Sequence, residues 1–398
     1  MCSSVDAQEF RVHVREWLIA HVPENWREQL RGSSHDEYVQ FQQWWLKELR
    51  AGGLLAPHWP VEWGGGGRTL EEQVVLYEEM ARFPAPRPNI HLVGLHHTFH
   101  TLLAAGTEEQ RAKHLPAILD GEIWCQGFSE PEAGSDLASL RTRAERDGDV
   151  YVVNGQKVWS SYAADAKWCL LLARTDHQVS KTQGITFLLM EMDSPGITVR
   201  PIRQATGNQE FSEVFLDNVR IPVENLVGEE NQGWQLAQVT LAAERGPGAI
   251  EMAERVRAAI DRLIVDTVRR YGDSQRVPTE VKAALSRYWS RAEMLRELCI
   301  QMIFASQQTR STGYESSVIK LVFSELLQDL THYATELSGP LEHYRAEPMP
   351  GEGWDSHNWL LDYIGSYEWT IAGGTNDIQR NLISERILDL PREPRWTA

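Results

Sequence analysis

The chain has 398 residues, of which 42% are hydrophobic, and a formal net charge of -17 at pH 7. It is too long for one ordinary core, and apolar enough to fill two or three packed units. The acidic balance argues against a nucleic-acid partner, because such proteins present basic faces to phosphate. Any polyanionic ligand must instead meet a local basic patch.

The spacing of the cysteines and the hydropathy of the chain indicate the cellular compartment of the protein. Cys2, Cys125, Cys169 and Cys299 are widely spaced and form neither a C-x-x-C pair nor a disulfide framework. The N-terminal residues lack a basic segment followed by an apolar one, and apolar runs such as 185–190 are only strand-sized. We therefore expect a cytoplasmic protein that makes no membrane contact.

The spacing of apolar residues divides the chain into three parts. Residues 1–121 show three- and four-residue spacing and predict an N-terminal helical bundle, with helices over 38–49 and 70–83. Residues 122–231 carry short β-rich runs separated by Asp-Gly, Asn-Gly and Pro-Gly turns, which predict a β-barrel or sandwich domain. The expected strands cover 150–153, 168–173, 185–192, 197–202 and 212–216.

Helical spacing returns after Gly233-Trp234, so residues 232–398 predict a C-terminal helical bundle. The expected helices cover 236–243, 251–271, 281–307, 317–337 and 377–390. The fold class is therefore α+β and multidomain, with one β domain between two helical bundles.

Two segments of the β-rich part carry the chemistry. The segment 127–139 reads Gly-Phe-Ser-Glu-Pro-Glu-Ala-Gly-Ser-Asp-Leu-Ala-Ser, and 154–161 reads Asn-Gly-Gln-Lys-Val-Trp-Ser-Ser. Gly and Ser supply small donors where a polar ligand approaches closely, and Trp supplies a flat apolar wall. In this order the segments resemble the flavin-edge signature of the acyl-CoA dehydrogenase family, and the resemblance extends over nearly the whole chain.

The resemblance implies an FAD-dependent enzyme that removes an α-proton and a β-hydride from an acyl-CoA or acyl-carrier thioester. Family members place the catalytic Glu at one of two positions. One is here Gly373, which has no side chain, and the other is Glu244 in the sequence Leu-Ala-Ala-Glu-Arg. Glu244 is therefore the expected base, and the Gly373 N–H is the expected donor to the thioester carbonyl.

Further roles also follow from the resemblance. Gln126, Phe128 and Ser129 correspond to residues along the flavin edge, Trp159 to one against the ring, and Ser161 to one near flavin N5. The cofactor-binding positions near the pyrophosphate and adenosine are Thr375, Asn376 and Asp377, and the substrate-binding positions are Ser135 and Arg245. An electron-transfer flavoprotein is the expected acceptor, and no metal is expected.

The chain departs from the family where homotetrameric members complete the FAD site in trans. Those members have an Arg-x-x-Phe-Gly segment, which residues 269–272 match only partly and out of register. They also have a Gln followed by a Gly-Gly-x-Gly loop, and this chain has Glu-Leu-Ser-Gly-Pro at 336–340 instead. Pro340 has no N–H, and Glu336 adds negative charge near a diphosphate. Two assemblies stay open, a homotetramer with other trans residues or an α2β2 heterotetramer with a paralogue, as in actinobacterial steroid-degrading members.

Several alternatives remain from the sequence. The same fold supports flavin oxidases and monooxygenases, and a subunit of this kind can serve only to complete a partner's flavin site. Gly246-Pro247-Gly248 after the expected base indicates a widened acyl pocket and a bulky, branched or ring-bearing acyl group. His96 and His100 have the i, i+4 spacing of a metal pair, but without the H-E-x-x-H pattern they are interpreted, with His91 and His97, as lining a helix surface or the acyl cavity.

Overall fold

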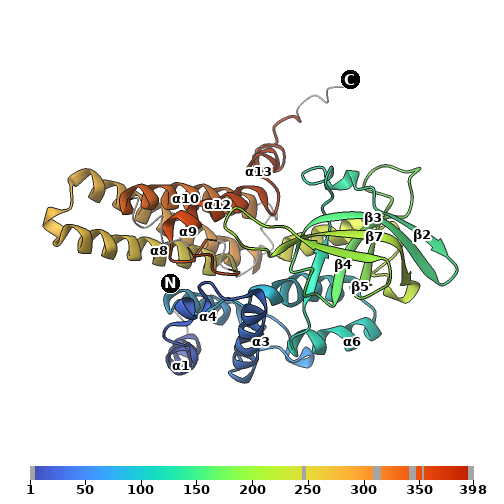
Figure 1. Cartoon of the computed structure of the whole chain (residues 1–398), viewed down its shortest axis with the longest axis horizontal. Coiled ribbons are helices and arrows are strands. Elements are labelled where there is room, and N and C mark those ends of the chain that lie inside the picture. The colour runs from blue at the N-terminus through green and yellow to red at the C-terminus, as the bar shows by residue number, and fades with distance from the viewer. Residues whose placement is uncertain (1–4, 244–247, 308–314, 340–346, 352–353, 393–398) are drawn as a thin grey trace.

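The computed structural model describes residues 5–243, 248–307, 315–339, 347–351 and 354–392. It places a β domain between two helical regions, as expected (Figure 1). The N-terminal helices lie below the long helical arm formed by α8, α9, α10 and α12, and the sheet lies at the opposite end of the molecule from the tip of that arm. The expected fold class, a helical N-terminal domain, a curled β domain and a helical C-terminal domain, is confirmed.

The N-terminal region is built of helices, and three of them begin at capping residues that are recognisable in the sequence. Ser34, Thr69 and Thr107 each cap a helix and pair with Glu or Gln three residues later in a capping box. The helices are α1 (Val5–His21), α2 (Trp26–Leu30), α3 (His35–Ala51), α4 (Leu70–Arg82), α5 (Phe99–Ala105) and α6 (Glu108–Leu119), with short turns η1 (Val61–Trp63), η2 (Asn89–His91) and the π-helix η3 (Val93–Thr98).

The β domain is a seven-stranded sheet in the order β1-β4-β2-β3-β7-β6, with β5 paired to β4. The strands are β1 (Trp124–Gly127), β2 (Arg143–Asp147), β3 (Val150–Ser161), β4 (Trp168–Arg174), β5 (Ile185–Glu191), β6 (Ile197–Pro201) and β7 (Phe211–Pro222). The sequence did not predict β1, which is very short, or β2, whose charged side chains are mostly exposed. β3 runs on to Ser161, beyond the expected end at 153.

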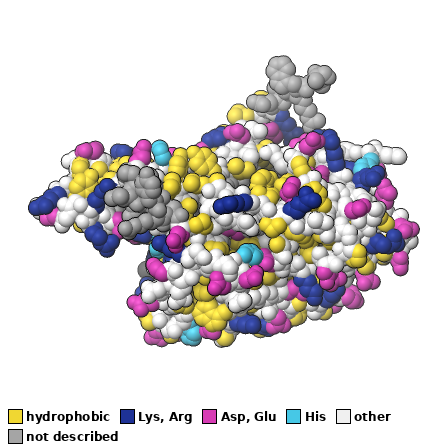
Figure 2. Space-filling view, in the orientation of Figure 1, with side chains coloured by type: hydrophobic (Ala, Val, Ile, Leu, Met, Phe, Trp, Pro, Cys, Tyr) yellow, Lys and Arg dark blue, Asp and Glu magenta, His cyan; other side chains and the backbone are white. Residues whose placement is uncertain are grey.

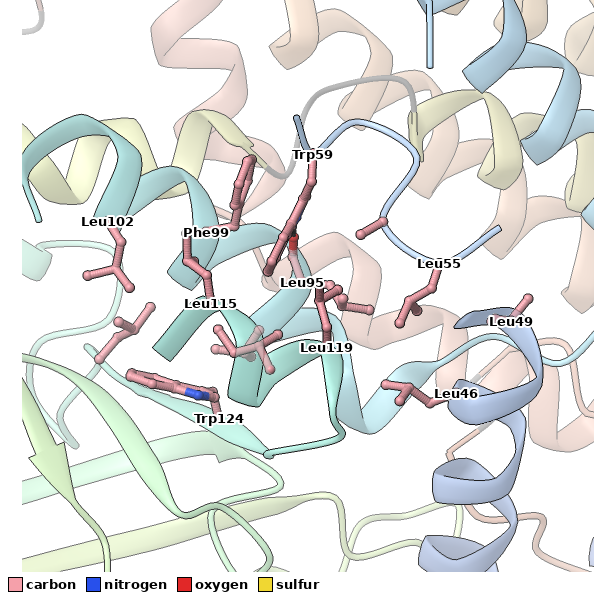
Figure 3. Close-up of a cluster of buried hydrophobic side chains, with 14 of the residues drawn as sticks. Leu46, Leu49, Leu55, Trp59, Leu95, Phe99, Leu102, Leu115, Leu119 and Trp124 are labelled. Atoms are coloured by element: carbon pink, nitrogen blue, oxygen red, sulfur yellow. Dashed lines mark hydrogen bonds between the residues drawn. The ribbon is translucent and has the colours of Figure 1, made fainter. Parts of the chain in front are cut away.

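Strand β4 is buried along its whole length because both of its faces are covered. Trp168, Leu170 and Leu172 belong to the core shared with the N-terminal helices, whereas Cys169 and Leu171 belong to the core inside the curled sheet. Figure 3 shows part of the first core, where Trp59, Phe99, Leu115 and Trp124 lie together. Burial on both faces explains why this strand is a continuous apolar run rather than an alternating one.

The C-terminal helices are α7 (Gly233–Ala243), α8 (Gly248–Tyr271), α9 (Thr279–Gln307), α10 (Glu315–Ser338), α12 (Trp359–Ile371) and α13 (Asn376–Leu382), with the short turn η6 (Ser274–Arg276) and the π-helix η7 (Ile383–Ile387). Helix α12 was not predicted. The expected helix over 377–390 is wrong in part, because α13 ends at Leu382, η7 ends at Ile387, and 388–390 are not helical. Among the described residues, no helix has both the length and the hydropathy needed to cross a membrane.

We propose domain limits at residues 121 and 231, because each lies in a connection between helix and sheet. Gly121 follows α6 at φ +102°, a conformation that favours glycine, and β1 begins shortly afterwards. Asn231, at φ +69°, follows η5 (Val223–Asn225) and comes before α7.

A buried cluster of charges joins the N-terminal helices to the arm. The Asp355 carboxylate accepts hydrogen bonds from Arg27 of α2 at 3.0 Å and from Arg255 of α8 at 3.1 Å. Arg262 of α8 lies 3.6 Å from the other carboxylate oxygen, and Arg255 also donates to the Ala85 carbonyl at 2.8 Å. Burial alone would raise the pKa of Asp355, but the surrounding guanidinium groups hold it well below its usual range.

We expect Asp355→Asn to destabilise the protein by about 3 kcal/mol, because it leaves buried arginines without their counter-charge. The exposed Asp329, which pairs with Arg291 at 2.8 Å, supplies a matched control. Asp329→Asn should cost less than about 1 kcal/mol. Thermal and denaturant unfolding of the two variants measures the difference. Equal stability of both would show that the buried cluster does not hold the domains together.

Candidate active site

The signature segment is fixed to the sheet by a buried ion pair. Lys157 of β3 donates to the Glu130 carboxylate at 2.9 Å and to the Phe128 carbonyl at 3.0 Å, and its side chain is 1% exposed. Glu130 also accepts from the backbone N–H groups of Arg141 at 2.7 Å and Thr142 at 2.8 Å. These bonds hold both ends of the loop that follows β1.

Burial and mutual attraction act in opposite directions on this pair. Burial lowers the pKa of Lys157, although the Glu130 charge raises it in part. Burial alone would raise the pKa of Glu130, but the Lys157 charge and the backbone donors bring it below its usual value. Sequence reasoning missed this role, although one signal was available: Tyr151, Val153, Gly155 and Lys157 fall on the same side of an alternating strand.

Trp159 has the geometry of a binding platform. Its φ of +61° is in the left-handed region, which a bulky side chain occupies only under constraint, and its side chain is 58% exposed. The pairing of β3 with β7 shifts register between Lys157 and Ser160, which turns Trp159 outward. Its ring and that of Phe211 are nearly perpendicular, with centroids 6.2 Å apart, and the exposed part of the indole is a flat apolar surface.

The other expected flavin-edge residues lie on the same part of the sheet. Gln126 is on β1, Ser129 accepts a hydrogen bond from the Val158 N–H at 3.0 Å, and Ser161 pairs with Phe211. Phe128 is buried against Phe187 at 5.7 Å, so its side chain supports the site from within the core. Ser135 is exposed in the turn after 133. The expected base Glu244 and its neighbour Arg245 lie outside the described residues.

The Gly373 loop supplies a backbone donor. Gly373 and Gly374 have φ values of +65° and +88°, and Gln379 holds the Gly373 carbonyl with a hydrogen bond of 2.9 Å. The Gly373 N–H makes no hydrogen bond with any residue that the structure describes. A left-handed backbone disfavours a side chain here, so the position suits an N–H donor and not a catalytic carboxylate.

The positions expected near the pyrophosphate follow this loop directly. Thr375 caps α13 and accepts from the Ile378 N–H. The Asn376 side-chain oxygen accepts from Lys320 of α10 at 2.8 Å and from Ser324 at 3.0 Å. Lys320 is a basic group at this site that sequence reasoning did not identify. Burial lowers its pKa to about 8. Asp377 is exposed and pairs with Arg380 at 3.0 Å.

Three titratable side chains from different domains have lost much of their hydration. Burial raises the pKa of Tyr77 of α4, of Glu210 before β7, and of Glu368 of α12, where it reaches about 7. Each nevertheless keeps part of its surface accessible. The Glu210 charge also raises the pKa of Glu368, since like charges repel.

Glu210 connects the two halves of the site. Its carbonyl accepts from the N–H of Tyr162, the residue after Ser161, and its carboxylate accepts from the Gly351 N–H at 3.0 Å. The neighbouring Glu368 lies on the helix that leads into Gly373. The fold therefore brings the end of β3 and the helix that leads into the Gly373 loop into the same region of the molecule.

Comparison with known proteins agrees with this geometry. Models of the acyl-CoA dehydrogenase N-terminal, middle and C-terminal domains match residues 4–122, 125–219 and 231–388. The chain belongs to the acyl-CoA dehydrogenase family. This establishes an acyl-CoA dehydrogenase of a flavoprotein family.

Individual relatives cover the whole chain. Acyl-CoA dehydrogenase IpdE1 of Mycobacterium tuberculosis is 36% identical over 408 residues, covering 98% of this chain and 99% of the relative. The solved Tcur3481-Tcur3483 steroid ACAD has a TM-score of 0.84 at 29% identity, covering 98% of this chain and 99% of that chain. The ChsE4-ChsE5 complex from Mycobacterium tuberculosis has a TM-score of 0.82 at 28% identity, with the same coverage.

We expect Lys157→Met to destabilise the protein by about 3–5 kcal/mol and to lower its flavin content, because Glu130 is left buried without its counter-charge. Lys181→Met is the control, since it removes an exposed ion pair to Asp136 in the same segment. Adding Glu130→Gln to Lys157→Met should restore part of the loss. Unfolding midpoints and flavin absorbance per subunit test this. A Lys157 variant as stable as the Lys181 variant would contradict it.

Proposed function

We propose that this dehydrogenase binds FAD and carries out α,β-dehydrogenation of an acyl-CoA, with Glu244 as the base. The observation that carries the proposal is the outward, constrained Trp159 on β3 together with a left-handed glycine at 373, on two elements that Glu210 and Glu368 bring into one region. Trp159, Ser161, Gln126 and the Asn376 region would hold the cofactor. Bound FAD would supply the hydride acceptor, and an electron-transfer flavoprotein would reoxidise it.

The protein's own groups would handle the proton and the carbonyl. The Gly373 N–H donates to the thioester oxygen as negative charge develops there, which makes the α-proton more acidic. Glu244 takes that proton. Helix α7, which ends at Ala243, is anchored to α5 by a hydrogen bond of 2.7 Å between Thr240 and Thr101.

We expect Glu244→Gln to keep the yellow flavin spectrum and lose anaerobic bleaching by acyl-CoA, with a rate decrease of at least about 100-fold, because a general base is removed. Glu368→Gln is a matched control, since it removes another buried carboxyl group, on the helix that leads into Gly373. It should keep most of the bleaching rate. If Glu368→Gln abolished bleaching and Glu244→Gln did not, the base would be Glu368.

The second part of the proposal is assembly as an α2β2 heterotetramer with a paralogue. The two altered trans segments meet in the structure, where an Arg270 guanidinium group donates to the Leu337 carbonyl, and Glu336 adds an exposed negative charge nearby. This leaves Arg270 engaged within its own chain. Pro340 lies outside the described residues. Two of the similar solved structures are complexes of paired chains, Tcur3481-Tcur3483 and ChsE4-ChsE5.

Exposed apolar side chains support an assembly of some kind. Tyr367 and Ile371 of α12 are 48% and 63% exposed, and Leu388 and Leu390 after η7 are 59% and 52% exposed. Figure 2 shows hydrophobic surface extending from the helical arm to its junction with the β domain. Apolar surface of this kind is typical of an interface between chains.

We expect the chain expressed alone to purify with well under one FAD per subunit, because the trans contacts that would stabilise the cofactor are missing. Co-expression with a dehydrogenase-like paralogue should raise the content to about one FAD per pair of chains. Flavin absorbance and light scattering measure occupancy and mass. Incubation with excess FAD controls for cofactor lost during purification. A homotetramer with a full FAD complement would rule out the heteromer and leave the catalytic assignment intact.

A further inference from the structure

One buried side chain holds both carbonyl groups of the glycine pair between α12 and α13. Gly373 and Gly374 lie in the left-handed region, and glycine backbones have many accessible conformations. The Gln379 amide donates to the Gly373 carbonyl at 2.9 Å and to the Gly374 carbonyl at 3.2 Å. Only the NH2 end of the amide can donate to two acceptors, so its orientation is determined. We call these two bonds the Gln379 clamp.

The Gln379 side chain packs directly on the backbone of this loop. It is 1% exposed, and a Cβ atom at Gly374 would come within 2.8 Å of its Nε2. Position 374 therefore has no room for a side chain while Gln379 is in place. The two bonds are not an ordinary helix cap, because α12 ends at Ile371 and the accepting carbonyls lie beyond its C-cap residue.

The Gln379 clamp limits the direction of the Gly373 N–H, which belongs to the peptide between Ala372 and Gly373. On one side of this peptide, the Ala372 N–H donates to the Glu368 carbonyl of α12 at 2.8 Å. On the other side, Gln379 holds the Gly373 carbonyl. Because both neighbouring peptides are anchored, the peptide between them cannot rotate freely. Gly373 itself is exposed, so a ligand can reach its N–H.

Helix α13, which carries Gln379, is itself fixed to the arm. The side-chain oxygen of its first residue, Asn376, accepts from Lys320 of α10 at 2.8 Å and from Ser324 at 3.0 Å. Figure 1 shows α13 at the end of the arm that lies nearer the sheet. The Gln379 clamp is therefore connected to α10, and it does not simply move with the glycine loop.

We propose that Gln379 is a positioning residue for the dehydrogenation: its two bonds orient the Gly373 N–H toward the thioester carbonyl of the acyl-CoA. Because its side chain is buried, it acts through Gly373 and does not contact the substrate. A donor that is fixed in advance stabilises the developing negative charge without reorganisation in the transition state. This inference rests on the proposed function, in which the Gly373 N–H is the carbonyl donor.

The first test is Gln379→Met, which keeps an unbranched side chain and removes the N–H donors. The FAD-loaded enzyme, with its paralogue if one is required, is mixed anaerobically with butyryl-CoA and with 3-cyclohexylpropanoyl-CoA. For the probe that bleaches the wild type faster, we expect the rate at saturation to fall about 10- to 100-fold. The Kd of that probe should change by less than about threefold, because the donor acts mainly on charge that develops in the transition state.

Gln110→Met is the matched control. Gln110 of α6 is 6% exposed, and its amide also donates to two carbonyls, those of Glu224 and Leu226, each at 2.8 Å. The same chemical change there should lower the unfolding midpoint and leave the bleaching rate of the FAD-loaded enzyme unchanged. If Gln379→Met also lowered only the unfolding midpoint, Gln379 would have a structural role alone and the inference would be wrong.

Gln379→Glu tests the donor itself and does not depend on Gln379→Met being stable. Burial raises the pKa of a carboxyl group. Below that pKa the protonated group can donate to a glycine carbonyl, whereas above it a carboxylate faces two carbonyl oxygens. We therefore expect its bleaching rate, divided by the wild-type rate at the same pH, to recover as the pH falls from about 8 to about 6. A ratio that is low and equal at both pH values would overturn the inference.

Infrared difference spectra of bound crotonyl-CoA, isotope-labelled at the carbonyl carbon, give a readout that needs no turnover. A hydrogen bond from the Gly373 N–H lowers the stretching frequency of the thioester carbonyl. We expect Gln379→Met to reduce this lowering and Gln110→Met to retain it. A full lowering in Gln379→Met would overturn the inference and leave the proposed function standing. Failure of both acyl-CoA probes to bleach the wild-type flavin would instead remove the proposed function.

Discussion

The packing of the N-terminal helices on the C-terminal arm depends on the buried carboxylate of Asp355. This side chain lies between Arg27 of the N-terminal domain and Arg255 and Arg262 of α8, and Arg255 extends the contact to the Ala85 carbonyl. Burying so many charges is costly unless each is paired. The cluster is therefore stable only when the N-terminal helices and the arm are in register. Because that register also sets how α4 packs on α8, the positions of the side chains between the two regions depend on it.

A second buried ion pair holds two segments of the β domain together. Lys157 and Glu130 connect the loop after β1 to β3, next to the position where the strand changes register and Trp159 turns outward. The constrained backbone at Trp159 can persist because its neighbours are held by bonds that are strong in a low-dielectric interior. The platform is thus rigid before any ligand arrives, which reduces the entropy lost on binding.

Low hydration sets the charge preference of the buried titratable groups. The same burial that raises the pKa of Glu368 to about 7 lowers that of His58 to about 3, since it disfavours the charged form of each group. A buried carboxyl group becomes a stronger base, and a buried imidazole becomes a weaker one. One physical cause thus shifts the two kinds of group in opposite directions.

Much of this protein could be inferred from local sequence. Capping boxes at Ser34, Thr69 and Thr107, apolar spacing and turn dipeptides predicted most helices and strands, because these signals act between residues close in the chain. The signature around 127–139 and 154–161 indicated the family, and the missing side chain at Gly373 directed attention to Glu244. Strand β2 was not predicted, because its charged side chains are mostly exposed and show no apolar alternation. Helix α12 was not predicted either, although its residues have helical spacing.

Only the tertiary structure decided which distant residues meet. Nothing in the spacing of His58, His96 and His100 showed that their rings stack, because His58 reaches the others only when its loop packs on η3 and α5. The pairs Lys157 with Glu130 and Glu210 with Glu368, and the cluster around Asp355, are likewise products of packing. Loss of hydration is also a property of the folded interior. The sequence therefore determined which titratable groups are present, while the fold decided how burial shifts their pKa values.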